Sequence, residues 1–399
     1  MSALLDYRLV GRKILISAGE ASGEMYATQL VAELRRRYPD ADFFGCAGPR
    51  MRAAGGRAVI NAESLSVVGL VEVVSHIPRI YKEFRKLLKA AREEKPSLAI
   101  LTDSPDFHFR LAKHLKQMGV PVVYYVAPQV WAWRQGRTKV MRRIIDLLVC
   151  IFPFEEAFFR KHGIRAIYSG HPLTRMYRPG KTRRDFRSQY GLDETVPLLG
   201  LLPGSRKGEW ERHLPVLLDA VERLKTKRPL QYALAVPEGG FPLDEEKWRK
   251  RIRDLSIQVI EGDTWNLLAH ADVLLAASGT VTVEAALAGT PMVTYYKVSP
   301  LSWKLGRRLV KVPHLTMVNL IADERIVPEF MQSEATGESL SSAVEALLAS
   351  PERMERMRAD LRRVREVLEG SDDPIARAAD EMELLIEPCE ERAQHAAAR

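Results

Sequence analysis

The sequence predicts an α/β protein built from two Rossmann-like domains that face each other across a cleft. Its 399 residues are enough for two or three domains with sizeable cores. Short apolar runs alternate with helical segments, the pattern of parallel sheets covered by helices on both faces. A polar, basic stretch with Pro and Gly at residues 172–195 interrupts the alternation, which then starts again. We therefore expect that stretch to be the crossing between two domains.

We place the first domain at residues 1–175. It is expected to begin with the apolar strand 13–18 (KILISA) and to contain an irregular stretch before residue 61, followed by a long amphipathic region. The other elements expected there are helix 25–38, strand 42–46, strand 97–102, helix 106–118, strands 120–126 and 146–152, helix 154–162 and strand 164–169.

We place the second domain at residues 190–365 and a terminal helix and tail at residues 366–399. Residues 339–386 have a helical pattern, and packing of these helices back onto the first domain is one expected arrangement. The other elements expected there are strand 196–202, helix 211–226, strands 230–236 and 256–260, helix 264–269, strand 272–276, helix 281–288 and strand 291–296.

Composition indicates a soluble or peripheral protein without a structural metal site, and we expect no cofactor. The chain is 46% hydrophobic and 28% charged, ordinary for this class. Its three cysteines show no paired spacing, which favours a reducing compartment and argues against a structural metal site. The N-terminus has Asp6 within its apolar part and no small-residue cleavage site, so we expect no signal peptide. No uninterrupted run of about twenty apolar residues is present.

The net charge of +9 is unevenly distributed along the chain. Residues 1–180 hold 29 Lys and Arg against 16 Asp and Glu, whereas the remainder has a slight acidic excess. A basic half suggests an anionic partner: nucleic acid, anionic lipid or a phosphorylated substrate. No nucleic-acid-binding module is evident, so we expect no nucleic acid.

Asp103 is the most informative candidate for chemistry. It stands at the carboxyl end of the apolar run 98–101, and ligands of open parallel sheets bind beyond the carboxyl ends of the strands. A carboxylate there is placed to act as a base on a substrate. The alternative is that Asp103 only caps the helix that follows it.

Two motifs of the second half suit a phosphorylated ligand. In LPGSR (202–206), Gly204 permits close backbone approach, Ser205 offers a hydroxyl and Arg206 can grip a phosphate; the alternative is a plain strand-to-helix turn. The second motif is SGTVTVEAALAGTP (278–291). Its candidate residues are Ser278, Gly279 and Thr280, at a helix start that forms an anion site, and Glu284, which suits ribose hydroxyls or merely complements the helix dipole.

Two motifs of the first half suit a sugar. GEASGE (19–24) opens a helix after the first strand, and Glu20, Ser22 and Gly23 are its candidates for binding a polar ligand. It is neither a dinucleotide fingerprint nor a Walker loop. In PQVWAWR (128–134), one of Trp131 and Trp133 is expected to fill the core, and the other to stack on a sugar or line an acyl groove.

The whole set of motifs resembles one family, the lipid-A-disaccharide synthases. The resemblance is collinear from about residue 13 to 330. Asn319 matches the family's asparagine near the cleft and is expected to bind the donor, although a loop-capping asparagine is the alternative. The chain departs from the family pattern at four positions. Glu24 stands where Asp is usual, Ser104 where Ala is common, His108 where Asn is common, and Ala127 where Ser is common. The motifs that carry the resemblance are GEASGE, AGPRM (47–51), VVGLVEVV (67–74), TDSPDF (102–107), PQVWAWR, FPFE (152–155), GHPL (170–173), LPGSR and SGTVTVEAALAGTPMV.

The resemblance implies a two-domain inverting glycosyltransferase of the GT-B type. Such an enzyme transfers 2,3-diacylglucosamine from its UDP derivative to the 6-hydroxyl of 2,3-diacylglucosamine 1-phosphate. We expect Asp103 to be the base, with Asp106 as runner-up, and the leaving UDP to be stabilised by Ser205, Arg206 and the amides around residues 279–280 without a metal. The alternatives are another UDP-sugar enzyme of this architecture, such as a muramyl-lipid glycosyltransferase or an epimerase, and a basic nucleic-acid-binding protein.

Acylated substrates lead us to expect reversible docking on the cytoplasmic face of the inner membrane of a Gram-negative-type bacterium. Residues 77–91 combine an apolar stripe with Lys82, Arg85 and Lys86, the pattern of an interfacial helix. The alternative is ordinary core packing with a solvated basic face. The apolar run 65–74 is a candidate acyl groove, and a smaller patch of the same kind surrounds Trp303. A homo-oligomer is also compatible with the sequence.

Overall fold

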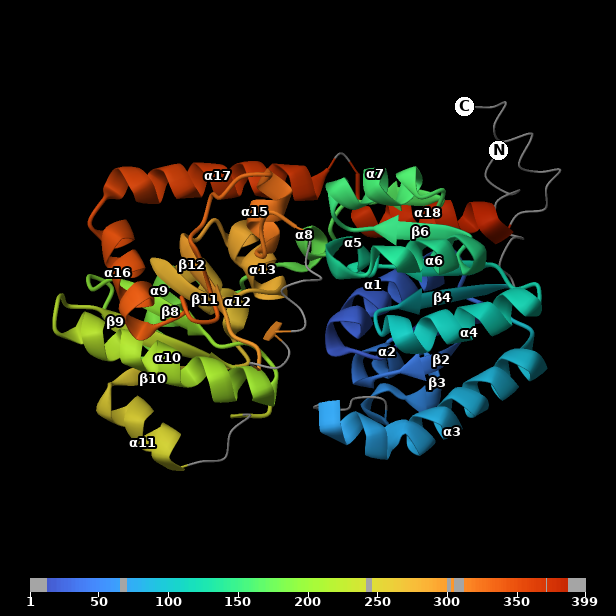
Figure 1. The fold of residues 1–399 in the computed structure, drawn as a ribbon, viewed down its shortest axis with the longest axis horizontal. Helices are drawn as coiled ribbons and strands as arrows, with labels where there is room; N and C mark the ends of the chain where they lie inside the picture. The colour runs from blue at the N-terminus through green and yellow to red at the C-terminus, as the bar shows by residue number, and fades with distance from the viewer. Residues whose placement is uncertain are drawn as a thin grey trace. The chain divides into compact units, whose positions relative to one another are not determined.

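The computed structural model describes residues 13–64, 70–241, 246–299, 303–304, 312–370 and 372–386, with the backbone alone over 70–77. The chain divides into two compact units, each with one parallel sheet (Figure 1). Unit 1 comprises the chain up to Arg175 together with the chain from Leu368 onward, and unit 2 is Met176–Val367. The α/β class with two parallel sheets is confirmed.

Unit 1 contains a sheet whose seven described strands run in the order β3-β2-β1-β4-β5-β6-β7. The strand order reverses between β1 and β4, which pair directly in parallel. Ligands of such sheets bind beyond the carboxyl ends of the strands at this reversal. The strands are β1 (Lys13–Ala18), β2 (Asp42–Ala47), β3 (Arg57–Asn61), β4 (Leu98–Thr102), β5 (Val122–Tyr125), β6 (Leu147–Cys150) and β7 (Ala166–Tyr168).

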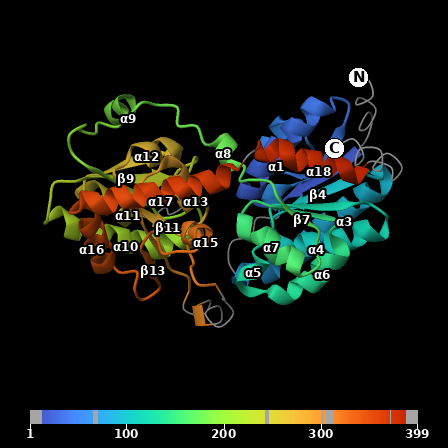
Figure 2. The same cartoon turned by 90° about the horizontal axis from the view of Figure 1, so that it is seen from above.

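Helices cover this sheet, and the last of the described helices is one of them. Figure 2 shows α18, drawn in red, beside α1, so the terminal helix does pack back on the first unit. Arg37 at the end of α1 joins them, because its guanidinium contacts Asp380 at 2.6 Å and Glu383 at 3.0 Å. The helices are α1 (Ala21–Arg37), α2 (Pro49–Ala53), α3 (Leu70–Glu94), α4 (Pro105–Gln117), α5 (Val130–Trp133), α6 (Thr138–Ile144), α7 (Pro153–Lys161) and α18 (Pro374–Ile386), and α8 (Leu173–Met176) lies at the unit boundary.

Unit 2 repeats the same plan with six described strands in the order β10-β9-β8-β11-β12-β13. The reversal here lies between β8 and β11, which again pair in parallel. The strands are β8 (Leu198–Leu202), β9 (Gln231–Val236), β10 (Ile257–Glu261), β11 (Val273–Ala277), β12 (Met292–Tyr296) and β13 (Glu329–Met331). The helices are α9 (Arg183–Gln189), α10 (Lys207–Lys225), α11 (Glu246–Asp254), α12 (Thr264–His270), α13 (Thr280–Ala288), α15 (Met317–Ala322), α16 (Gly337–Leu348) and α17 (Pro351–Glu369).

The central strands of both sheets are buried along their whole length, which explains their unbroken apolar sequences. Every residue of β4, β8 and β11 is buried. Strands with helices on both faces have no solvent side and therefore need no polar alternation. Within the described ranges, no helix is long and apolar enough to span a bilayer.

The structure differs from the expected elements in several places. Strand β3 lies in the stretch that we expected to be irregular. The sequence did not indicate it because RAVIN is an edge strand with exposed ends and a weak apolar pattern. Helix α1 begins at Ala21, four residues before the expected start, so most of GEASGE forms its first turn. The stretch 172–195 is not a plain connection either, since it contains α9, whose Phe186 is fully buried in unit 2.

Candidate active site

Asp103 lies just beyond the carboxyl end of β4, at the strand-order reversal of unit 1. Its carboxylate accepts hydrogen bonds from two main-chain amides that follow the neighbouring strand β1. The amide of Gly19 lies 2.9 Å from Oδ1, and the amide of Glu20 lies 3.1 Å from Oδ2. The GEASGE and TDSPDF motifs, although far apart in the sequence, therefore form one local structure.

Two glycines of GEASGE leave the space that this carboxylate occupies. A Cβ atom on Gly23 would lie 1.9 Å from Asp103 Oδ2, and one on Gly19 would lie 2.8 Å from Ser104 Oγ. We expected Gly23 to bring the backbone close to a ligand. In the structure its missing side chain makes room for Asp103, and the Gly19 amide is occupied by the same carboxylate.

The surroundings of Asp103 raise the pKa of its carboxyl group. The side chain is 11% exposed, and this burial raises the pKa of Asp103 to about 7 against the lowering effect of the two amides. Burial penalises the charged form, whereas amides that donate to the carboxylate favour it. The group is thus a carboxylate that can accept a proton near neutral pH.

Asp106, the other candidate base, has different surroundings. It lies in the first turn of α4 and is 76% exposed. Its carboxylate forms ion pairs with Arg137 and, at 3.7 Å, with Arg134. A carboxylate that is solvated and already paired with two guanidinium groups is not held for a substrate hydroxyl, so the geometry favours Asp103.

The remaining acidic and hydroxyl groups of GEASGE divide between surface and core. Glu20 and Ser22 are exposed at the start of α1. Glu24 is buried, and its Oε1 accepts a hydrogen bond of 3.0 Å from the amide of Met51 in the first turn of α2. Glu24 therefore caps a neighbouring helix, which explains why a carboxylate is needed at this position.

The two tryptophans of PQVWAWR take opposite positions. Trp131 is buried, donates from Nε1 to Glu155 at 2.9 Å, and packs edge-on against Phe154. Trp133 is 43% exposed, with the Arg134 guanidinium 4.0 Å from the centre of its ring. Trp131 therefore fills the core and Trp133 is the one that offers a surface for stacking.

In unit 2, the LPGSR loop follows β8 at the strand-order reversal. Its amides are occupied by Glu209, whose Oε2 accepts from the amides of Ser205 at 3.0 Å and Arg206 at 3.1 Å. Gly204 has a φ of +105°, and a Cβ atom on it would lie 2.3 Å from the same carboxylate oxygen. The Arg206 side chain is exposed. The sequence analysis missed Glu209, although its place three residues after Arg206 is the spacing of a capping box.

The SGT motif follows β11 on the other side of the same reversal and begins helix α13. Gly279 and Thr280 are exposed, and a Cβ atom on Gly279 would meet nothing within 4 Å. Ser278 instead donates to the carbonyl of Leu315 at 3.2 Å. The first amides of a helix have no intrahelical partner, so this exposed end can receive an anion.

Glu284 lies one turn further along α13, beside two aromatic residues that the sequence analysis did not select. Its Oε1 accepts a hydrogen bond of 3.2 Å from Trp265 Nε1, and burial raises the pKa of Glu284. The ring of Tyr177 packs edge-on against Trp265, with 5.6 Å between the ring centres. Trp265 lies in a short apolar helix whose sequence gives no sign that the indole faces a carboxylate.

Asn319 is fully buried and its amide group bonds within its own loop. Its Nδ2 donates to the carbonyl of Val327 at 3.0 Å and to Glu329 at 2.9 Å, and its Oδ1 accepts from the amide of Val327. These bonds are those of the loop-capping interpretation, and contact of Asn319 with the donor stays a prediction.

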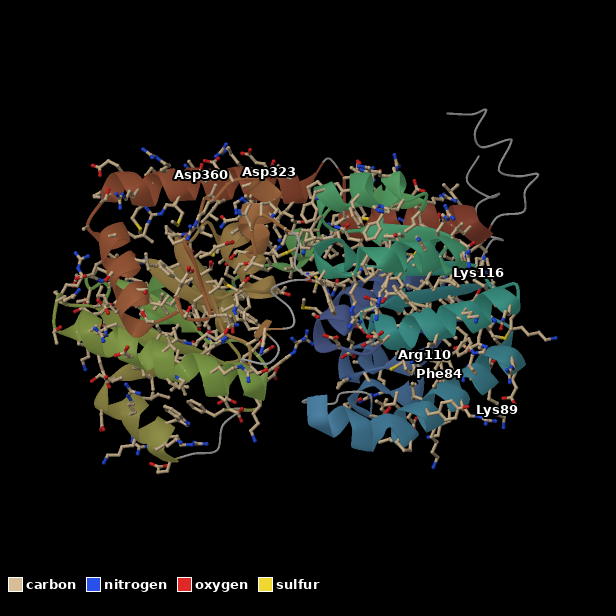
Figure 3. All side chains as sticks on the ribbon, in the orientation of Figure 1. Phe84, Lys89, Arg110, Lys116, Asp323 and Asp360 are labelled. Carbon is tan, nitrogen blue, oxygen red and sulfur yellow. The ribbon has the colours of Figure 1, made fainter. Side chains whose placement is uncertain are left out.

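Helix α3 combines core packing with an exposed basic face. Leu87 and Leu88 are buried, and Phe84 packs edge-on against Phe107 of α4 (Figure 3). The apolar stripe over this part of the helix is therefore core. Tyr81, about one turn earlier in the helix, is 58% exposed.

The basic residues chosen for membrane docking are all exposed. Lys82, Arg85 and Lys86 lie on the solvent side of α3, and Lys86 also contacts Glu83 at 2.8 Å. The candidate acyl groove at 65–74 lies outside the residues whose side chains are described. Of the smaller patch around Trp303, only residues 303 and 304 are described. The described residues hold no group of three or more His, Cys, Asp or Glu that suits a metal ion.

Solved structures of low sequence identity share this fold. UDP-GlcNAc 2-epimerase from Neisseria meningitidis, solved with UDP-GlcNAc, is similar with a TM-score of 0.62 at 12% identity, over 93% of this chain and 98% of that one. A calicheamicin glycosyltransferase is similar with a TM-score of 0.57 at 18% identity, over 94% and 98%. These likenesses confirm the GT-B-like fold.

Other proteins share a much higher sequence identity with this chain than these solved structures do. A lipid-A-disaccharide synthase of Solibacter usitatus is 54% identical over 376 residues, covering 94% of this chain and 98% of the relative. One of Koribacter versatilis is 44% identical over 362 residues, covering 90% and 94%. Residues 14–381 also match the model of the family described as lipid-A-disaccharide synthetase. The chain therefore belongs to the lipid-A-disaccharide synthase family and is a glycosyltransferase of lipid A biosynthesis.

Proposed function

We propose that this enzyme transfers 2,3-diacylglucosamine from UDP-2,3-diacylglucosamine to the 6-hydroxyl of 2,3-diacylglucosamine 1-phosphate, with inversion. The products are the β-1,6-linked disaccharide 1-phosphate and UDP. The observation that carries the proposal is the carboxylate of Asp103, buried at the strand-order reversal of unit 1 and held by two amides. Membership in the family supplies the two substrates.

Asp103 acts as the general base for the acceptor. As the acceptor oxygen forms its bond to the anomeric carbon, the hydroxyl proton moves to the Asp103 carboxylate. The bond from the anomeric carbon to the diphosphate breaks on the opposite face, and its electron pair leaves with UDP. A single displacement of this kind inverts the configuration, and the sugar passes through a state with oxocarbenium character. Glu20 and Ser22, exposed beside Asp103, and Trp133 are proposed to contact the acceptor sugar.

Unit 2 binds the donor and stabilises the leaving diphosphate. The first amides of α13, at residues 279 and 280, supply hydrogen-bond donors where negative charge develops. The exposed guanidinium of Arg206 adds a positive charge, with the Ser205 hydroxyl beside it. Glu284 accepts hydrogen bonds from the ribose hydroxyls, and Trp265 fixes the position of its carboxylate. These amides, the hydroxyl and the guanidinium thus balance the negative charge of the leaving diphosphate.

We further propose that the enzyme docks on the anionic cytoplasmic face of the inner membrane to reach its acylated substrates. The support is the exposed basic face of α3, with Lys82, Arg85 and Lys86, and the basic excess of the first 180 residues. Anionic lipid attracts such clusters, and the exposed ring of Tyr81 suits the interface between water and lipid.

The test is a transfer assay with the two acylated glucosamine substrates, in parallel with UDP-N-acetylglucosamine alone. We expect disaccharide and UDP from the first mixture and no change in the second. Consumption or epimerisation of UDP-N-acetylglucosamine would instead assign the chain to another UDP-sugar reaction. The Asp103→Asn variant should bind UDP normally and lose transfer by at least about a thousandfold, because the amide cannot take the proton.

A further inference from the structure

The backbone at the base is held in an unusual conformation. Asp103 has a φ of +56° and the next residue, Ser104, has a φ of +38°. Residues with a side chain rarely adopt the left-handed region, and two in succession require support from the surrounding structure. This double turn directs the Asp103 side chain from the end of β4 back toward the amides that follow β1.

The support is two hydrogen bonds to the main-chain carbonyl of Asp103 itself. The hydroxyl of Tyr124, on the neighbouring strand β5, donates one of them. His108, one turn along α4, contributes the other from Nδ1 at 2.9 Å. Both side chains lie on the buried side of the turn, since Tyr124 and His108 have no exposed surface.

The second nitrogen of His108 is fixed by a serine of β1. His108 Nε2 lies 2.7 Å from Ser17 Oγ, and Ser17 is also fully buried. A carbonyl can only accept, so Nδ1 must carry the proton, and a neutral ring then leaves Nε2 to accept from the Ser17 hydroxyl. Burial lowers the pKa of His108 to about 4, in keeping with a neutral ring at working pH.

We infer that Ser17, His108 and Tyr124 form a positioning network for the base, which acts on catalysis through the carbonyl of Asp103 and touches no substrate. The inference rests on the proposed role of Asp103. Ser17 selects the imidazole tautomer that can donate, and His108 and Tyr124 then hold the left-handed turn. This left-handed turn then holds the carboxylate in the orientation in which the carboxylate takes the proton of the acceptor. A small displacement of a reacting group is enough to lower turnover about a hundredfold.

The test compares His108→Leu, His108→Asn, Tyr124→Phe and Ser17→Ala in steady-state kinetics. Loss of the His108 donor should lower kcat by about 10- to 100-fold while the KM for the UDP donor stays within about twofold. The asparagine variant keeps an amide donor and should recover most of the lost kcat. Ser17→Ala and Tyr124→Phe remove a single hydroxyl each and should lower kcat about 3- to 30-fold.

His162→Leu is the matched control. His162 also uses Nδ1 toward a main-chain carbonyl, that of Phe158 at 2.8 Å, but it lies at the end of α7 and its bond is local to that helix. The kcat of the His162→Leu variant should equal that of the wild type. Circular dichroism and urea unfolding establish that each variant is folded, and UDP binding checks that the proposed donor site of unit 2 is unaffected. Where His108→Leu fails to fold, the two hydroxyl variants carry the test.

Two different failures are distinguishable. Wild-type kcat in folded His108→Leu, Ser17→Ala and Tyr124→Phe, with Asp103→Asn inactive, would refute the positioning network and leave the base assignment in place. Near-normal turnover of Asp103→Asn would refute the base assignment itself. An equal loss of kcat in His162→Leu would also contradict the network, because it would mean that any such histidine has this effect.

Discussion

At the scale of single residues, the candidate site depends on groups that are costly for folding. A carboxylate with 11% exposure and two consecutive left-handed residues both destabilise the native state. They persist because two amides bind the carboxylate of Asp103, while an imidazole and a phenol bind its carbonyl. Such concentration of strain and burial at one carboxylate is typical of catalytic positions.

The raised pKa of Asp103 predicts how activity depends on pH. The proposed base can work only when it is deprotonated, and burial raises the pKa of Asp103 to about 7. We therefore expect kcat/KM to fall about tenfold for each unit of pH below about 7 and to level off above it. The measurement is a pH–rate profile from mildly acidic to mildly alkaline pH, with UDP binding followed in parallel. A profile that stays flat throughout the acidic range would contradict the raised pKa.

Gly23 gives a second prediction at this scale. A methyl group at Gly23 would lie 1.9 Å from Asp103 Oδ2, so Gly23→Ala must displace the carboxylate. We expect kcat to fall about a hundredfold with little change in UDP affinity. The control is Gly136→Ala, because a Cβ atom there meets nothing within 4 Å. Equal activity of both variants would show that the carboxylate does not need this space.

At the scale of elements, α3 is the helix whose two faces serve different purposes. Its buried leucines attach it to unit 1, and its basic face is exposed to solvent. Each basic residue near an anionic surface contributes about 1 kcal/mol to binding. Changing Lys82, Arg85 and Lys86 together to Glu should therefore weaken binding to anionic vesicles by several kcal/mol without unfolding the protein.

A flotation assay with vesicles containing anionic lipid measures this effect. The control changes the same number of charges on α11 in unit 2, where Lys247, Arg249 and Lys250 are the basic residues to replace. The control protein should still float with the vesicles. If the α3 variant binds as the wild type does, or if wild type never binds, α3 is not the docking helix.

At the scale of the whole molecule, the chain leaves unit 1 and later returns to it. Unit 2 is inserted between Arg175 and Leu368, and α18 completes unit 1 by packing on α1. Arg37 is a polar tie between these two helices, with contacts to Asp380, Glu383 and the carbonyl of Ala376.

Removal of this tie should destabilise unit 1 alone. We expect Arg37→Ala to lower the free energy of unfolding by about 1–3 kcal/mol, because it leaves the partly buried carboxylate of Glu383 without its partner. Urea unfolding followed by circular dichroism measures the loss. UDP affinity should not change, since the residues proposed to bind the donor belong to unit 2. Reduced UDP affinity together with unchanged stability would contradict this division of roles.

The sequence by itself determined the α/β class, most elements to within a few residues, the family and the location of the main motifs. These features can be predicted from short stretches of sequence, because apolar runs, Gly and Pro positions and short motifs each involve residues that are close in the chain. Weak edge elements such as β3 escaped, since an exposed edge strand carries little apolar signal.

Only the tertiary structure decided what the motif residues touch. Gly23 makes room for a carboxylate from a distant part of the chain, and Asn319 bonds to Val327 and Glu329. It also decided that Trp131 is buried while Trp133 is exposed, and that His108 Nδ1 donates a hydrogen bond to the carbonyl of Asp103. The contacts of Asp103 with Gly23, His108 and Tyr124 follow from the order in which β1, β4 and β5 meet in the sheet, and a sequence pattern with a helical or strand period carries no information about that order.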